Sequence, residues 1–323
     1  MGDILFLQLS LPPMLAGCLA AIVCALPGNF LVLRRQALLG DTISHVALPG
    51  IVLAFVFTGS VAAVPMMMGA GVVAVLSVVL IEVIRRVGRV EPGAAMGVVF
   101  TSAFALGVLI LERTGSGGVH LDVEHALMGN LESLVWYDAV GWQSLLDPDA
   151  LAGLPPALPR LFLVLLGIGV LMRLAWRPLI VSTFDPGFAR ATGLPVDLIS
   201  LGLVAVTAVA AVAAFEAVGS ILVIAMFVCP PAAARLMTNR IGHQIAWSVV
   251  FAAASAVSGY VLGGYGPIWL GFEQSVSAAG MVATMSGLLL ALVCCIGPQR
   301  RRASATLVGS TTTGRTGLAR SRP

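Results

Sequence analysis

Residues 39–50, LGDTISHVALPG, place two ionisable side chains, Asp41 and His45, in a stretch that is otherwise largely apolar. The two lie four positions apart, so on a helix of ~3.6 residues per turn they project from the same face. Ionisable groups inside a membrane-spanning segment are costly and mark functional sites. A carboxylate beside an imidazole is also a suitable ligand pair for a divalent metal. The stretch therefore predicts a membrane helix that handles a metal ion.

The composition of the whole chain also indicates a membrane protein. Hydrophobic residues make up 59% of the 323 residues, charged residues make up 10%, and the mean hydropathy is +1.01. Soluble domains carry roughly 25% charged residues. We expect an all-α, polytopic fold of nine crossings, or of eight if one segment is re-entrant. The expected crossings are residues 11–33, 37–58, 61–84, 93–111, 158–176, 196–215, 217–237, 244–263 and 277–297.

The basic residues indicate how the chain is oriented. All 18 are arginines, because the chain contains no lysine. With nine crossings and the N-terminus outside, only Arg113 and Arg160 lie outside, which satisfies the positive-inside rule. We expect a membrane domain over residues 1–298 and a disordered basic cytoplasmic tail over 299–323 that contacts membrane lipid. The missing lysine also excludes ATP hydrolysis by this chain, because the phosphate-binding loop requires one.

The cytoplasmic segment 184–195, FDPGFARATGLP, predicts a short helix with a cap at each end. Asp185 is a good N-cap and Pro186 suits the first helical position. Gly193 can adopt the left-handed conformation that ends a helix, and Pro195 prevents continuation. A capped helix between two membrane spans can dock rigidly into a partner, whereas a plain connecting loop needs no caps.

Three segments carry a family resemblance. They are residues 33–54 (LRRQALLGDTISHVALPGIVLA), 184–195 (quoted above) and 215–236 (FEAVGSILVIAMFVCPPAAARL). In this order they resemble three regions of the manganese/zinc/iron ABC transporter permeases, which are the membrane subunits of bacterial metal importers. The similarity extends from about residue 12 to residue 297.

The resemblance implies a type II ABC importer fold in the bacterial cytoplasmic (inner) membrane. Two copies of the chain, or this chain and a related permease, would form the pathway. Separate ABC ATPase subunits would bind underneath, and an extracytoplasmic metal-binding protein would deliver the ion. The transported Mn, Zn or Fe is cargo, so we expect no permanently bound cofactor and no nucleic-acid partner. The chain itself would be a transport subunit and not an enzyme.

The resemblance also assigns residues to roles. Asp41 and His45 match metal-site positions of the family, and Glu216 is a candidate third ligand. Two carboxylates and a neutral imidazole nearly balance a divalent charge and disfavour copper(I). The segment Asp185–Gly193 matches the coupling helix. Its coupling residues are Asp185, Pro186, Phe188, Ala189, Arg190 and Gly193.

The placement of Glu216 stays open. Asp41 lies ~9 Å from the cytoplasmic end of its helix, whereas Glu216 lies ~30 Å along its own. Either the helices depart from this simple layout, or Glu216 belongs to a gate instead of the metal site. The alternative for Asp41 and His45 is a structural contact between helices.

Prolines and a glycine near these ligands are candidates for gating kinks. Pro49 removes the hydrogen bond that the His45 carbonyl would accept. Pro230 and Pro231 likewise remove the hydrogen bonds that two carbonyls one turn earlier in their own span would accept. Gly219 lies near the other end of that span. Static kinks that only shape the packing are the alternative.

Three other functions compete with an ATP-driven importer of bare ions. A proton-coupled secondary metal transporter could use the same ionisable side chains, but such a carrier needs no capped docking helix. A type II importer of a metal chelate would favour a wide, uncharged cavity. An intramembrane metallo-enzyme lacks support, because the His-Glu-x-x-His and Gly-x-Ser-x-Gly motifs are absent. The residues do not choose among Mn, Zn and Fe, and they do not indicate the direction of transport.

Overall fold

The computed structural model describes residues 2–59, 63–114, 131–269, 271 and 276–297. Some side chains within helices also lie outside the described set, and those of Asp41 and Glu216 are among them. The predicted tail, residues 299–323, lies outside the described residues as well. The division into a membrane domain and a tail therefore stays a prediction.

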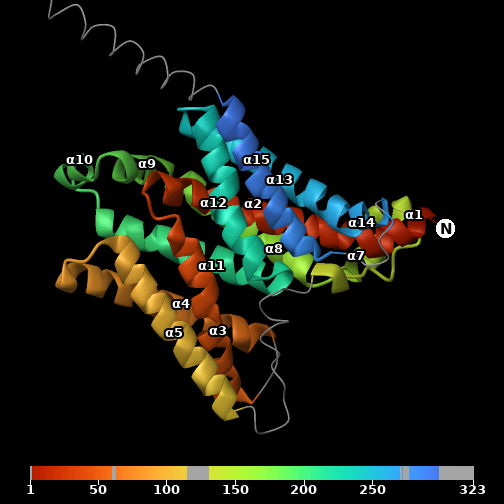
Figure 1. Cartoon of the computed structure of the whole chain (residues 1–323), viewed down its shortest axis with the longest axis horizontal. Coiled ribbons are helices and arrows are strands. Elements are labelled where there is room, and N and C mark those ends of the chain that lie inside the picture. Colours follow the sequence, from red (N-terminus) through yellow and green to blue (C-terminus); the bar gives the residue numbers. More distant parts are fainter. Residues whose placement is uncertain (1, 60–62, 115–130, 270, 272–275, 298–323) are drawn as a thin grey trace, which may run out of the picture.

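Every regular element in the described ranges is a helix (Figure 1). The long helices are α2 (Leu11–Leu33), α3 (Leu38–Thr58), α4 (Ala63–Gly88), α5 (Pro92–Thr114), α8 (Ala157–Leu174), α11 (Val196–Val218), α12 (Ser220–Met237), α13 (Ile241–Gly264) and α15 (Ala278–Ile296). The short ones are α1 (Gly2–Leu5), η1 (Phe6–Ser10), η3 (Leu131–Ser133), η4 (Trp142–Leu145), α7 (Pro148–Ala152), α9 (Trp176–Phe184), α10 (Pro186–Ala191) and α14 (Gly266–Trp269).

The long helices confirm the predicted all-α, multi-span fold. Each expected crossing corresponds to one long helix, with ends that differ by a few residues. Among the described residues, eight helices are long and apolar enough to cross a bilayer. Helix α3 is the ninth long helix, and its apolar stretch of described residues is the shorter segment Pro49–Thr58. The prediction of eight to nine spans therefore holds, with α3 as the span that carries polar residues.

Helix α2 lies at the centre of the main core. It packs against α8, α11, α12 and α13, and most of its small residues are fully buried, including Ala16, Ala20, Ala21 and Ala25. Lipid tails are as apolar as the side chains that face them, so association of membrane helices depends on close packing, which small residues allow. The alanines of α2 therefore explain why four other helices can approach it.

Helices α3, α4 and α5 form a second group, which diverges from the α2 core in Figure 1. Gly50 of α3 and Gly69 of α4 face each other at their closest point. A Cβ on Gly50 would lie 2.6 Å from both the Ala70 Cα atom and the Gly69 carbonyl oxygen. A Cβ on Gly69 would lie 2.5 Å from the Gly50 carbonyl oxygen. Glycine at both positions thus lets the two backbones touch.

Candidate metal pathway and coupling helix

His45 lies in α3 about seven residues from its start and is half-buried. Its imidazole packs against two rings of α5. The ring centroid of Phe100 is 4.8 Å away, and that of Phe104 is 5.8 Å away with the planes at 89°. One turn further along α3, Pro49 packs against Gly107 of α5, where a Cβ would lie 3.0 Å from the proline. Helix α5 therefore sets the orientation of the His45 ring.

The other two predicted ligands are placed only through their backbones. Asp41 lies in the first turn of α3, and Glu216 lies in the last turn of α11. Both side chains are outside the described residues. Among the side chains that the structure describes, no group of three or more His, Cys, Asp or Glu residues could hold a metal. The three-ligand site therefore stays a prediction.

The packing of α12 relates the start of α3 to the end of α11. Gly219 has φ of 82° and joins α11 directly to α12. Phe227 lies eight residues beyond Gly219, or about 12 Å along the helix. Its ring packs on Gly40, the residue before Asp41, where a Cβ would lie 2.7 Å from the Phe227 Cγ atom. The α11–α12 corner is therefore within about 20 Å of Gly40, a bound comparable with the separation of about 20 Å that helix lengths alone predict.

The candidate gating prolines lie inside continuous helices. Pro49 is within α3, and Pro230 and Pro231 are within α12. The carbonyl of Phe227, from which Pro231 removes the usual helical donor, lies 2.5 Å from the position that a Cβ of Gly28 would occupy. Helices α2 and α12 can therefore approach at this carbonyl only because residue 28 is glycine. This contact explains a packing role, while a gating role for the prolines and Gly219 stays a prediction.

Residues 184–195 contain the predicted capped helix, α10. The Asp185 side chain accepts a hydrogen bond of 2.8 Å from the Phe188 amide, and Pro186 is the first helical residue. At the other end, Gly193 has φ of 81°. The Leu194 amide donates to the Ala189 carbonyl and the Gly193 amide to the Arg190 carbonyl, the two bonds of a Schellman motif. Both predicted caps are confirmed.

Helix α10 presents one large apolar side chain outward. Phe188 is 57% exposed, whereas its neighbour Ala189 is fully buried against the protein. Arg190 forms an exposed ion pair of 3.4 Å with Asp197 of α11, which contributes little to stability because solvent screens it. An exposed phenylalanine on a short helix with a cap at each end is the kind of feature that inserts into a partner's groove.

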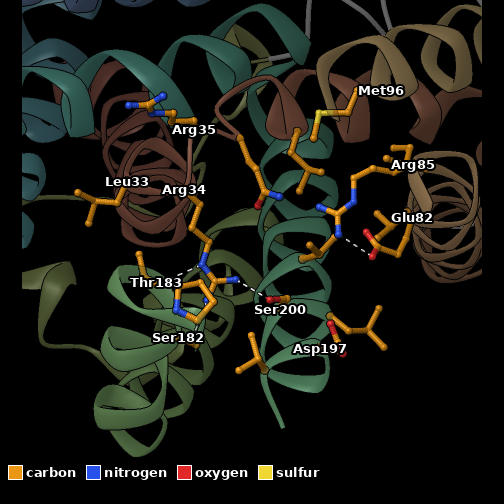
Figure 2. Close-up of a pocket in the computed structure, with 18 of the residues that line it drawn as sticks. Leu33, Arg34, Arg35, Glu82, Arg85, Met96, Ser182, Thr183, Asp197 and Ser200 are labelled. Atoms are coloured by element: carbon orange, nitrogen blue, oxygen red, sulfur yellow. Dashed lines mark hydrogen bonds and ion pairs between the residues drawn. The ribbon is translucent and has the colours of Figure 1, made fainter. Parts of the chain in front are cut away.

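A cavity of about 410 Å³ lies behind α10 (Figure 2). Its walls come from the α2–α3 turn, from α4 and α5, and from α9, α10 and α11. Four arginines and two carboxylates line it, namely Arg34, Arg35, Arg85, Arg190, Glu82 and Asp197. Glu82 and Arg85 form an ion pair of 2.7 Å within α4. The cavity thus lies between α10 and the helices that surround His45.

Arg34 donates three side-chain hydrogen bonds at this cavity. Its Nε donates to the Thr183 hydroxyl (3.0 Å), one Nη donates to Ser182 (2.9 Å), and the other donates to Ser200 (2.9 Å). Figure 2 shows the guanidinium pointing from the end of α2 toward these hydroxyls. Burial lowers the pKa of Arg34 from its ordinary value, but arginine starts so high that the group stays charged at neutral pH.

Sequence reasoning missed this contact. It assigned no contact to Arg34, and it did not predict α9, whose Ser182 and Thr183 accept hydrogen bonds from the guanidinium. Serine and threonine hydroxyls within apolar helices are too common to be informative by themselves. The available signal was the arginine itself, at the end of a span and next to the predicted metal helix.

The comparison with known proteins agrees with this architecture. The model of the ABC 3 transport family matches residues 7–141 and 160–296. The manganese transport system membrane protein MntD of Bacillus subtilis (strain 168) is 38% identical over 275 residues, which are 85% of this chain and 88% of MntD. The zinc transport system membrane protein TroD of Treponema pallidum (strain Nichols) is 34% identical over 285 residues, which are 88% of this chain and 73% of TroD.

A solved structure is also similar. A chain of PsaBC from Streptococcus pneumoniae, solved in complex with Fab, superposes with a TM-score of 0.71 at 25% sequence identity. The match covers 92% of this chain and 94% of that one. The likeness therefore extends over nearly the whole chain.

Proposed function

This chain belongs to the ABC 3 transport family and is a multi-pass membrane protein, and we propose that it is the permease subunit of an ATP-driven importer of a divalent metal ion. One observation carries the proposal. Helix α3 begins at the cavity behind the capped helix α10 and carries His45 about 10 Å further into the span. The candidate docking helix and the start of the helix that carries the intramembrane ligand thus line the same cavity.

The metal passes a site formed by Asp41 and His45, with Glu216 as the third ligand. The rings of Phe100 and Phe104 hold the imidazole, so that it does not reorganise when the ion arrives. Glu216 is proposed as the third ligand from the family resemblance, and it lies in the last turn of α11, three residues before the corner at Gly219. Manganese and zinc occur in the names of the relatives, and carboxylate and imidazole ligands also suit iron.

Opening and closing of the pathway are driven by a separate ABC ATPase subunit that binds α10. Phe188 enters a groove of that subunit, while the two caps keep α10 rigid enough to transmit movement to α9 and α11. Pro49, Gly219, Pro230 and Pro231 supply the positions where the spans bend. The chain itself hydrolyses no ATP.

The assembly lies in the bacterial cytoplasmic membrane. A second permease completes the pathway, either another copy of this chain or a related one, and the structure of PsaBC supports such a pairing. An extracytoplasmic metal-binding protein delivers the ion to the outer face. Membrane lipid covers the exposed apolar faces of the spans, such as the residues Phe162, Leu163 and Leu166 of α8.

The test is metal accumulation in metal-starved cells that carry this chain with its candidate ATPase and binding protein. Manganese, zinc and iron are measured at matched expression for the wild type and for Asp41→Asn and His45→Ala. Gly71→Ala is the control, because a Cβ at Gly71 meets nothing within 4 Å. The expected result is a partner-dependent gain of one metal that both site variants lose and the control keeps.

Three outcomes would overturn the proposal. Accumulation that continues with a hydrolysis-deficient ATPase subunit would identify a gradient-driven carrier, the proton-coupled alternative. Normal accumulation by both site variants would place the metal pathway elsewhere. Uptake of a chelated metal alone, with no uptake of the free ion, would point to an importer of chelates.

A further inference from the structure

We propose that Arg34 is a positioning residue that joins the coupling helix to the metal-carrying helix, so that movement of α9, α10 and α11 reaches α3 through its guanidinium. This inference rests on the proposed function, because it requires an ATPase that moves α10. It concerns a different residue, which lies neither in the predicted metal site nor in the outward face of α10.

The geometry shows how one side chain can hold two moving elements. Ser182 and Thr183 lie at the end of α9, directly before α10, and Ser200 lies in the second turn of α11, directly after it. The Arg34 guanidinium donates to all three hydroxyls over 2.9 to 3.0 Å. The elements on either side of α10 are thereby tied to the same planar group. A displacement of α10 that carries them along must carry Arg34 too.

The α9 hydroxyls are fixed as acceptors. Ser182 donates its own hydrogen to the Leu179 carbonyl at 3.1 Å, and Thr183 donates to the same carbonyl at 2.6 Å. Their oxygen lone pairs therefore face the guanidinium. The end of α9 also carries the partial negative charge of a helix C-terminus, which favours a cation there. A charged arginine is stabilised in this position although all three of its acceptors are neutral hydroxyls.

The connection from Arg34 to α3 is short and stiff. Arg34 is the C-cap of α2, and its backbone enters a tight Schellman turn in which the Gln36 amide donates to Leu31 and the Arg35 amide to Val32. The Gln36 carbonyl then accepts from the Leu39 amide inside α3. No flexible linker separates Arg34 from Asp41, which lies seven residues later. Movement of the guanidinium is thus passed directly to the metal helix.

The chemistry requires arginine. Three acceptors from two helices are reached because the guanidinium presents its donors as a planar fork. A lysine at position 34 would keep the charge, but its ammonium is a single point and cannot span the same three oxygens. Removing one hydroxyl leaves the remaining bonds in place. Graded losses are therefore expected along a series of variants.

The experiment measures ions transported per ATP hydrolysed by the complete transporter in proteoliposomes, with wild type, Arg34→Ala, Arg34→Lys, Thr183→Val and Ser200→Ala. Thr183→Ser is the matched control, because it keeps the hydroxyl. Thermal unfolding of each variant separates a folding defect from a coupling defect. The affinity of the transporter for the metal ion and its basal ATPase rate are measured in the same preparations.

We expect Arg34→Ala to lower the ratio of ions to ATP about tenfold or more, because hydrogen bonds from a charged donor are lost. Thr183→Val and Ser200→Ala should each lower it less, Arg34→Lys should restore part of it, and Thr183→Ser should match the wild type. The inference is wrong if the ratio of ions to ATP in Arg34→Ala stays at the wild-type value. It is also wrong if a lower melting temperature fully accounts for the decrease in that ratio. If the wild type itself shows no ATP-dependent uptake, the proposed function fails instead.

Discussion

Gly40 lies directly against the ring of Phe227, so closely that a Cβ on residue 40 would be 2.7 Å from the phenylalanine Cγ atom and 2.8 Å from Cδ2. Gly40 precedes the predicted metal ligand Asp41, and Phe227 is fully buried in α12. The start of α3 can therefore approach α12 only with glycine at position 40. This contact holds the predicted metal helix against the span that carries Pro230 and Pro231.

Replacing Gly40 with alanine should force Phe227 from its position. We expect a loss of about 1–3 kcal/mol of stability, the usual cost of overpacking a buried site, together with reduced metal uptake. Thermal unfolding in detergent and cellular uptake measure the two effects. Gly97→Ala serves as the control because a Cβ there meets nothing within 4 Å. Equal stability of the two variants would show that Phe227 moves aside freely.

The contact between α3 and α4 gives a matched pair of glycines. Gly69→Ala should be strongly destabilising, because the added carbon would meet the Gly50 carbonyl oxygen and the Ala54 Cβ at 2.5 Å. Gly71→Ala, two residues away in the same helix, meets nothing and should stabilise by about 0.5–1 kcal/mol through helix propensity. Melting temperatures of the two variants should move in opposite directions. A shift of both in the same direction would contradict this packing.

The rings that hold His45 should affect metal affinity more than fold. Phe100→Leu leaves an apolar side chain in place but removes the flat surface 4.8 Å from the imidazole. We expect the metal concentration for half-maximal uptake to rise several-fold, while maximal uptake changes little. Uptake at a series of metal concentrations provides the measurement. A fall in maximal uptake at unchanged half-saturation would assign Phe100 to movement and not to ligand orientation.

The N-cap of α10 should determine how well the coupling helix is ordered. Asp185→Ala removes the carboxylate that accepts from the Phe188 amide, which costs about 1 kcal/mol. Hydrogen exchange of the peptide over residues 186–191 should then be several-fold faster, whereas Asp185→Asn should retain most of the protection. Unchanged exchange in Asp185→Ala would mean that the packing of Ala189 alone orders the helix.

The turn between α2 and α3 contains stored backbone strain. Arg35 has φ of 57° in the left-handed region, at the position where a Schellman motif normally has glycine. Arg35→Gly should therefore raise stability by about 1 kcal/mol, since the left-handed conformation costs an L-residue that amount. The melting temperature tests this. A decrease would show that the Arg35 side chain contributes more than its backbone costs.

Local features of the chain could be predicted from the sequence alone. The nine long helices follow from apolar stretches of bilayer length, and the bounds of α10 follow from Asp185, Pro186 and Gly193. These depend on residues within one or two turns of each other, so no knowledge of the rest of the fold is needed. The family could be predicted as well, because its three characteristic segments each lie within a short range.

Contacts between distant segments were decided only by the tertiary structure. Nothing near Arg34 in the sequence indicates that its guanidinium meets Ser182, Thr183 and Ser200, about 150 residues later. The same is true of His45 between two rings of α5. The distance between Glu216 and Asp41 stays a prediction, because both side chains lie outside the described residues. By contrast, the glycines at positions 28 and 40 let α2 and α3 pack closely on Phe227 of α12, because close packing in the membrane depends on shape, which hydropathy does not encode.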